Sequence, residues 1–131
     1  MEFFEEIRLA PPAAPKTTIP TPDASTLKRA LRIKDLPLYC ASIDTVLADN
    51  GDSGVIYCLW GEFRVNREEI RYGLRFSLPN CPNALAWTIT ANDESIVVHC
   101  TIDKQSHDED FIESIRLFMQ DWAQGIKKIA A

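Results

Sequence analysis

Glycine is scarce in this sequence, and its few copies are scattered. Only five glycines occur among 131 residues, and nowhere do they form a loop that could wrap a phosphate group. Histidine is rarer still, with two residues, and the four cysteines include no Cys-x-x-Cys pair. These shortages argue against a nucleotide-binding phosphate loop and against a zinc site built from closely spaced thiolates.

Residues suited to catalysis are also hard to find. His99 falls on the outer face of a predicted strand, and the neighbouring Cys100 points to the opposite face, so the two cannot form a nucleophilic pair. His107 falls in the first turn of a predicted helix, and the acidic residues gather in turns and at the start of that helix. We therefore assign no catalytic residue, no metal site and no cofactor, and we favour a non-enzymatic function.

The sequence has no hydrophobic run long enough to cross a membrane, and its first six residues are acidic where a secretory signal would be basic. Its net charge of -5 at pH 7 argues against general binding to nucleic acids or anionic membranes. A composition of 46% hydrophobic and 25% charged residues is ordinary for a globular protein. We expect a cytoplasmic protein with free thiols that binds neither nucleic acid nor membrane.

Proline is concentrated near the amino terminus, between Pro11 and Pro22. This pattern predicts a proline-rich tail or linker over residues 1–22, followed by a single α+β domain over residues 23–131. Alternatively, the tail docks on the domain through apolar residues near its start. Thr21-Pro22-Asp23 predicts the beginning of a short helix that runs to about Leu31.

Alternation of apolar and polar residues is strongest from Val55 to Leu78 and predicts one long β-hairpin. Its arms would be residues 55–65 and 70–78, with the turn centred on Arg67 and Glu68. One face of this hairpin would be apolar. The other would expose four residues of the kinds that anchor protein contacts, which are Trp60, Arg64, Arg71 and Arg75.

A second hairpin is predicted over residues 84–101, with Asn92-Asp93 at its tip, Ile89 opposite Ile96 and Trp87 opposite Val98. The segment 38–48 fits a helix or a strand. We favour a strand because the following turn cluster, residues 49–54, would join it to the first hairpin.

The carboxy-terminal segment predicts a long amphipathic helix, with Ser106 and Glu109 as a capping box. Its apolar stripe, from Phe111 to Ile129, needs a partner surface, and the inner face of the sheet is the large one on offer. The fold predicted is therefore an α+β domain, an antiparallel meander of four or five strands with this helix on one face and a short amino-terminal helix.

Two functions follow from this fold. The leading hypothesis is a non-enzymatic interaction or regulatory module that binds a protein partner, or a second copy of itself, through the outer sheet face. The order of strands and closing helix is also similar to helix-grip folds that carry lipids or other apolar ligands. The alternative is therefore a carrier with a cavity between helix and sheet, bordered by Gly61, Trp87 and Trp122.

Overall fold

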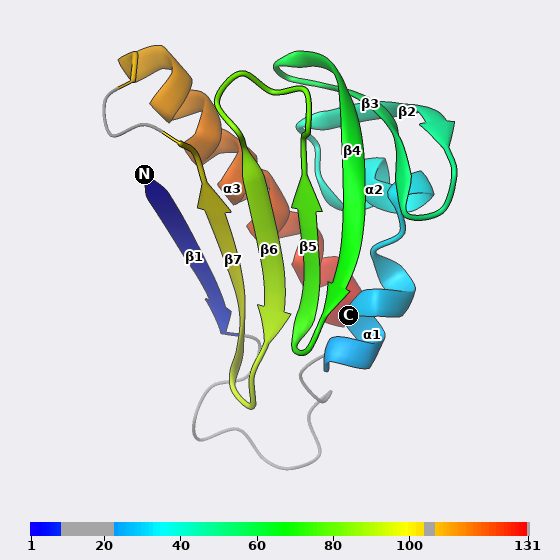
Figure 1. Ribbon diagram of the computed structural model, residues 1–131. Helices are drawn as coiled ribbons and strands as arrows, with labels where there is room; N and C mark the ends of the chain where they lie inside the picture. The colour runs from blue at the N-terminus through cyan, green and yellow to red at the C-terminus, as the bar shows by residue number, and fades with distance from the viewer. Residues whose placement is uncertain (9–22, 104–106, 131) are drawn as a thin grey trace.

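An antiparallel sheet of seven strands forms one layer of the protein, and the helices form the other (Figure 1). A computed structural model describes residues 1–8, 23–103 and 107–130. The strands are β1 (Glu2–Arg8), β2 (Ile43–Asp49), β3 (Ser53–Cys58), β4 (Gly61–Ile70), β5 (Gly73–Ser77), β6 (Ala86–Ala91) and β7 (Ser95–Thr101). The helical elements are α1 (Ala24–Ala30), the 3-10 helix η1 (Ile33–Asp35), α2 (Leu36–Tyr39) and α3 (Glu109–Ala130).

The strand order β1-β7-β6-β5-β4-β3-β2 makes β2 to β7 a continuous meander. The first strand of the chain adds to the far side of β7, where Phe3 pairs with Cys100 and Ile7 with Ile96. The α+β class with an antiparallel sheet is confirmed, but the sheet has seven strands rather than four or five. Residues 2–8, which we placed in a tail, form one of the additional strands, while residues 9–22 lie outside the described part of the chain.

The first predicted hairpin is wrong in its connections. Instead of one turn at Arg67 and Glu68, the chain turns twice, at Leu59-Trp60 between β3 and β4 and at Arg71-Tyr72 between β4 and β5. Gly61 ends the first turn with a φ of 114°, a left-handed conformation that favours glycine. We had predicted that this glycine lies within a strand, on the inner face of the sheet. Because the chain turns before it, the residues of β3 lie on the opposite faces from those predicted.

The second hairpin forms with a register two residues away from the predicted one. Ile89 lies opposite Val98 and Trp87 opposite Cys100, because the loop spans residues 92–94 rather than closing tightly at Asn92-Asp93. A shift of two residues keeps every side chain on its predicted face, since side chains alternate with a period of two. The strand favoured for residues 38–48 is present as β2, preceded by the single turn of α2.

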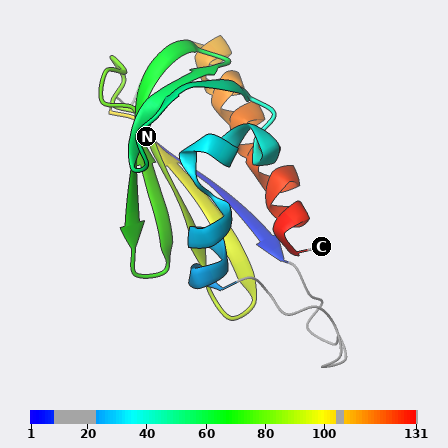
Figure 2. The same cartoon turned by 90° about the vertical axis from the view of Figure 1, so that its right-hand side faces the viewer.

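All helices of the described chain lie on the same side of the sheet, as Figure 2 shows. The apolar stripe of α3 is buried at Ile115, Phe118, Met119, Trp122 and Ile126, as the sequence predicted. Its aromatic rings meet those of the sheet in one cluster, with ring centroids 5.0 Å apart for Trp87 and Phe118 and 6.3 Å apart for Phe76 and Trp122. Fully burying each such side chain contributes roughly 1.5 to 3 kcal/mol before entropy is counted.

The short amino-terminal helix is also present and packs over β5 and β6. Its N-cap is Asp23, whose side chain accepts a hydrogen bond of 2.8 Å from the backbone N–H of Thr26. Hydrogen bonds from Thr26 hold the pKa of the Asp23 carboxyl below its usual range. None of the helices in the described segments is both long and apolar enough to cross a membrane.

Candidate functional site

The outer face of the sheet, on the side away from the helices, is the candidate site. It carries an uncharged strip, which we define as the outward positions of β6 and β7. Their inward neighbours, such as Trp87 and Val98, are buried beneath the helices, so alternation places these positions outside. The strip consists of Ala86, Thr88, Thr90, Ser95, Val97, His99 and Thr101.

Charged residues frame the uncharged strip on both sides. On one side β1 presents Glu2, Glu6 and Arg8, which are exposed. On the other side lie Arg75 of β5 and Glu68 of β4, which pair with each other across the two strands. A surface with an uncharged centre and a charged border has the anatomy of a protein interface, in which charge is depleted at the core and retained at the rim.

One transverse row of side chains crosses the strip and links both borders. From strand to strand it runs through Phe4, His99, Thr88, Arg75 and Glu68. The Phe4 ring is 63% exposed and stacks on the His99 ring with centroids 4.2 Å apart. The His99 Nε2 atom lies 3.1 Å from a carboxylate oxygen of Glu2. These contacts fix an exposed aromatic ring at the edge of the strip.

The structure separates the four predicted partner-binding residues. Arg64 and Arg75 lie on the outer face, as predicted, and Arg71 lies in the β4–β5 turn with its guanidinium 5.2 Å from the centre of the Tyr72 ring. Trp60 belongs to the β3–β4 turn and reaches the helix side of the sheet. The centroid of its indole ring lies 5.0 Å from the centroid of the Phe118 ring.

The indole N–H of Trp60 donates a 2.8 Å hydrogen bond to Ser114 Oγ on α3. Placing Trp60 on the outer face was therefore wrong, because the alternation of residues 55–65 continues past Cys58, where the strand ends.

Gly61, Trp87 and Trp122 do not border a common space. The two tryptophans are fully buried, with their ring centroids 6.3 Å apart, and they pack against each other and their aromatic neighbours. Gly61 instead follows a surface turn, where an added Cβ would meet nothing within 4 Å. The carrier hypothesis stays a prediction, and these three residues supply no shared pocket for it.

The four cysteines are free, and three of them are buried. Burial raises the pKa of the Cys40 and Cys100 thiols to about 12 and also raises the pKa of Cys58. Cys81 is the half-buried member of the set. Across the described residues, no three His, Cys, Asp or Glu side chains are grouped so that they could hold a metal ion.

We expect one thiol of the folded protein to react rapidly with a disulfide reagent such as Ellman's reagent at pH 8, and we expect it to be Cys81. A thiol with a pKa of about 12 is ionised in only about one molecule in ten thousand at that pH, and burial adds a barrier to access. Absorbance measures the number of fast thiols. The variant Cys81→Ser should lose the fast phase, and in denaturant four thiols of the original chain and three of the variant should react. A fast phase that survives in Cys81→Ser would contradict this.

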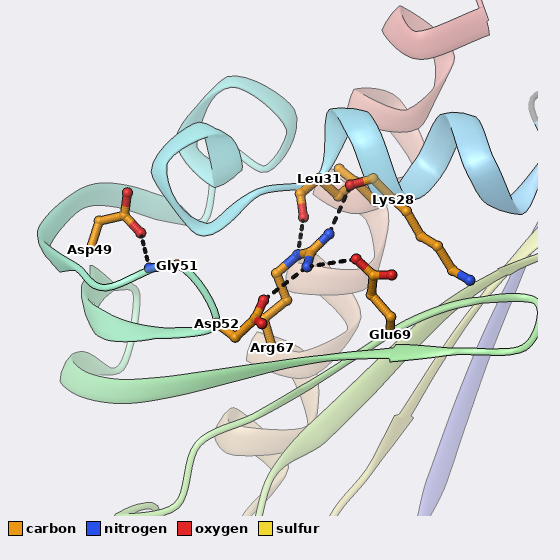
Figure 3. A network of polar contacts seen from close by, with 7 residues as sticks. All are labelled: Lys28, Leu31, Asp49, Gly51, Asp52, Arg67 and Glu69. Atoms are coloured by element: carbon orange, nitrogen blue, oxygen red, sulfur yellow. Dashed lines mark hydrogen bonds and ion pairs between the residues drawn. The ribbon is translucent and has the colours of Figure 1, made fainter.

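The role of Arg67, which we had placed in a turn, was not predicted from the sequence. It lies within β4 on the inner face, with its side chain 1% exposed, and it holds the end of α1 against the sheet (Figure 3). Its Nε and Nη2 atoms donate to the carbonyl oxygens of Leu31 and Lys28 at 2.9 and 2.8 Å. Both carbonyls belong to the end of α1, so Arg67 serves as a structural anchor rather than a surface charge.

No protein family matches the chain. No curated protein is similar to it in sequence.

Proposed function

We propose that the protein is a non-enzymatic interaction module that binds another protein, or a second copy of itself, through the outer face of the sheet. The observation that carries this proposal is the uncharged strip of β6 and β7 with charged residues on both sides. One quarter of the chain is charged, yet these seven neighbouring outward positions hold no Asp, Glu, Lys or Arg; five of them reach the surface, and Ala86 and Ser95 are buried.

The side chains of the strip suit a flat contact. Threonine, serine and alanine stand close to the sheet and lose little rotamer entropy when a partner covers them. Phe4 adds an exposed ring that a partner could bury, and aromatic residues are frequent anchors of interfaces. The face therefore offers uncharged contact at its centre and charged side chains at its border.

Arg75 belongs to this border, and Arg64 lies farther along the outer face of β4, while Trp60 and Arg71 do not belong to it. The border also contains Glu68 beside Arg75, so its charges alternate rather than forming a basic patch. Such a border favours a partner surface of mixed charge over a polyanion, because the alternating charges cancel at a distance.

The variants Val97→Arg and Thr88→Arg test the proposal. Each places a long charged side chain at the centre of the strip, where a partner would have to desolvate it, so we expect recovery of the bound partner to fall about tenfold or more. The measurement is quantitative mass spectrometry of proteins purified with the tagged chain from its source cells.

The control is Thr45→Arg, because Thr45 is an exposed residue of β2 outside the strip. It should bind as the original chain does, and circular dichroism should show that all variants fold. Light scattering of the purified chain tests self-association in the same variants. Partner recovery or self-association that is equal in all variants would remove the outer face from the proposal.

A further inference from the structure

The sheet has two edge strands, and they differ in their capacity to pair further. Strand β2 shifts register against β3 at two places, and such bulges protect an edge from pairing. Strand β1 pairs with β7 over seven consecutive residues without a shift and contains no proline. Its other side meets no strand among the described residues. Strand β1 is therefore the regular edge of the sheet.

The register of β1 against β7 determines which backbone N–H and C=O groups of β1 point towards the open edge. Met1 and Ile102 exchange both of their backbone hydrogen bonds, each 3.0 Å long. In an antiparallel pair, residues that exchange hydrogen bonds alternate with residues that do not. Odd-numbered residues of β1 therefore bond to β7, and Glu2, Phe4, Glu6 and Arg8 direct their backbone N–H and C=O groups away from β7, towards the open edge.

One antiparallel register of β1 with a second copy pairs opposite charges at both ends, although it also places Phe4 against Glu6 and Glu5 against Glu5. With a two-fold axis at Glu5, Glu2 lies opposite Arg8 of the second copy, and Phe3 lies opposite its Ile7. The residues with free backbone groups then face one another, so each such pair can exchange two hydrogen bonds. Registers centred on Phe4 or Glu6 lose this match, because they place Glu2 against Glu6 or Glu5 against Ile7.

The flank of α3 beside β1 fits the same symmetry. Two shallow hollows lie between this helix and β1, with volumes of about 280 and 220 Å³, and Gln120 and Glu5 line both. A two-fold axis near Gln120 makes the two helices antiparallel and brings Glu113 of each copy towards Lys127 of the other. These exposed residues share one helix face, since they are separated by two heptads.

We propose that two copies of this chain associate through β1, so that their sheets join edge to edge and their α3 helices lie antiparallel across the junction. Three features favour a second copy of the chain as the partner at this edge. They are the regularly spaced free backbone groups of β1, the opposite charges of Glu2 and Arg8, and the matching flanks of the two α3 helices. The contact leaves the uncharged strip itself uncovered, although Glu2 and Arg8 also belong to the border of the outer face. The dimer would present two uncharged strips side by side on one continuous sheet.

Charge exchange tests this register. In Glu2→Arg, and equally in Arg8→Glu, both symmetric pairs become like charges, and we expect the dimer to dissociate about tenfold more readily. The double variant Glu2→Arg/Arg8→Glu restores opposite pairs and should dimerise as the original chain does. An equimolar mixture of the two single variants should form heterodimers, because each pair across the junction then unites opposite charges.

Sedimentation equilibrium over concentrations up to about 1 mM measures these constants, since even weak complexes assemble in that range. A chain that remains monomeric throughout overturns the proposal, as does a dimer that the single variants do not weaken or that their mixture does not restore. Glu5→Gln gives a second readout. It removes the like charges that meet at the axis, so it should tighten the dimer about threefold, while Glu6→Gln should not.

The edge contact and the outer-face function can fail separately. Val97→Arg lies in the strip, one strand in from the edge, and should leave the dimer unchanged. If Val97→Arg dissociates the dimer and the charge exchanges do not, the copies associate through the strip and the edge proposal is wrong. If the charge exchanges behave as expected and no partner depends on Val97, the edge proposal stands without the outer-face function.

Discussion

Replacing Arg67 with methionine is expected to lower the free energy of unfolding by about 3 kcal/mol. Methionine keeps most of the buried length of the side chain, so little cavity forms. The loss of stability comes from the carbonyl oxygens of Lys28 and Leu31. They stay at the buried end of α1 but no longer accept a hydrogen bond. An unsatisfied buried acceptor costs about 1 to 3 kcal/mol, and two are created here.

The ion pairs of Arg67 matter less than these carbonyl contacts. Its Nη1 atom lies 3.0 Å from Asp52 and 3.3 Å from Glu69, but the side chains of these acids are 74% and 52% exposed. Water screens such pairs, so Asp52→Asn and Glu69→Gln should each change stability by less than about 1 kcal/mol. Lysine at position 67 should behave like methionine, because one ammonium group cannot reproduce the planar fork that reaches both carbonyls.

Urea unfolding followed by tryptophan fluorescence measures all four variants. The outcome that would contradict this account is an Arg67→Met variant as stable as the original chain, or acid variants that lose as much as Arg67→Met does. The first result would mean that α1 is held by Leu27 and its apolar neighbours alone. The second would mean that the charges, not the helix carbonyls, determine the role of Arg67.

The parts of the fold that the sequence predicted are those that depend on local periodicity. The stripe of α3 has a helical period over five turns, and the arms of the β6–β7 hairpin alternate without interruption, so their buried faces followed directly. Their register did not follow, because the loop at residues 92–94 sets it and a shift of two residues leaves the alternation unchanged.

The predictions of strand ends and of side-chain faces failed where the alternation of apolar and polar residues continued through a turn. Residues 55–65 alternate without a break, yet the chain reverses at Leu59-Trp60, and the one sign of this in the sequence is Gly61. A glycine within a strand pattern often marks a bulge or a turn, and giving it that weight would have moved Trp60 off the outer face. Arg67 gave no comparable sign, since an arginine in a strand is usually solvated.

The candidate site was predicted in part for the same reason. Alternation placed Arg75, Thr88 and His99 on the outer face, and the structure has them there. The contribution of Phe4 could not be foreseen, because it depends on β1 pairing with a strand almost one hundred residues later. Pairings over such distances leave no periodic trace in a short segment.

The variant Gly125→Ala is expected to destabilise the protein by about 2 to 3 kcal/mol, against the intrinsic preference of the helix. Alanine favours an exposed helix interior over glycine by about 1 kcal/mol. At this position, however, α3 crosses α2 so closely that an added Cβ would overlap the backbone carbonyl of Tyr39. Backbone atoms cannot rotate away as a side chain can, so the two helices must separate or the chain of α2 must shift.

Whether Gly125→Ala lowers or raises the stability of the protein shows how firmly α2 is held against α3. Lys128 donates a 3.2 Å hydrogen bond to the carbonyl of Leu38, so α3 contacts the end of α2 through two neighbouring carbonyls. A shift that accommodates alanine would strain this contact as well. Calorimetry should show a melting temperature lower by roughly 10 °C, whereas Gln124→Ala, on the exposed side of the same turn, should change it little. A rise in the melting temperature of Gly125→Ala would mean that α2 yields freely and that helix propensity outweighs the packing of α2 on α3.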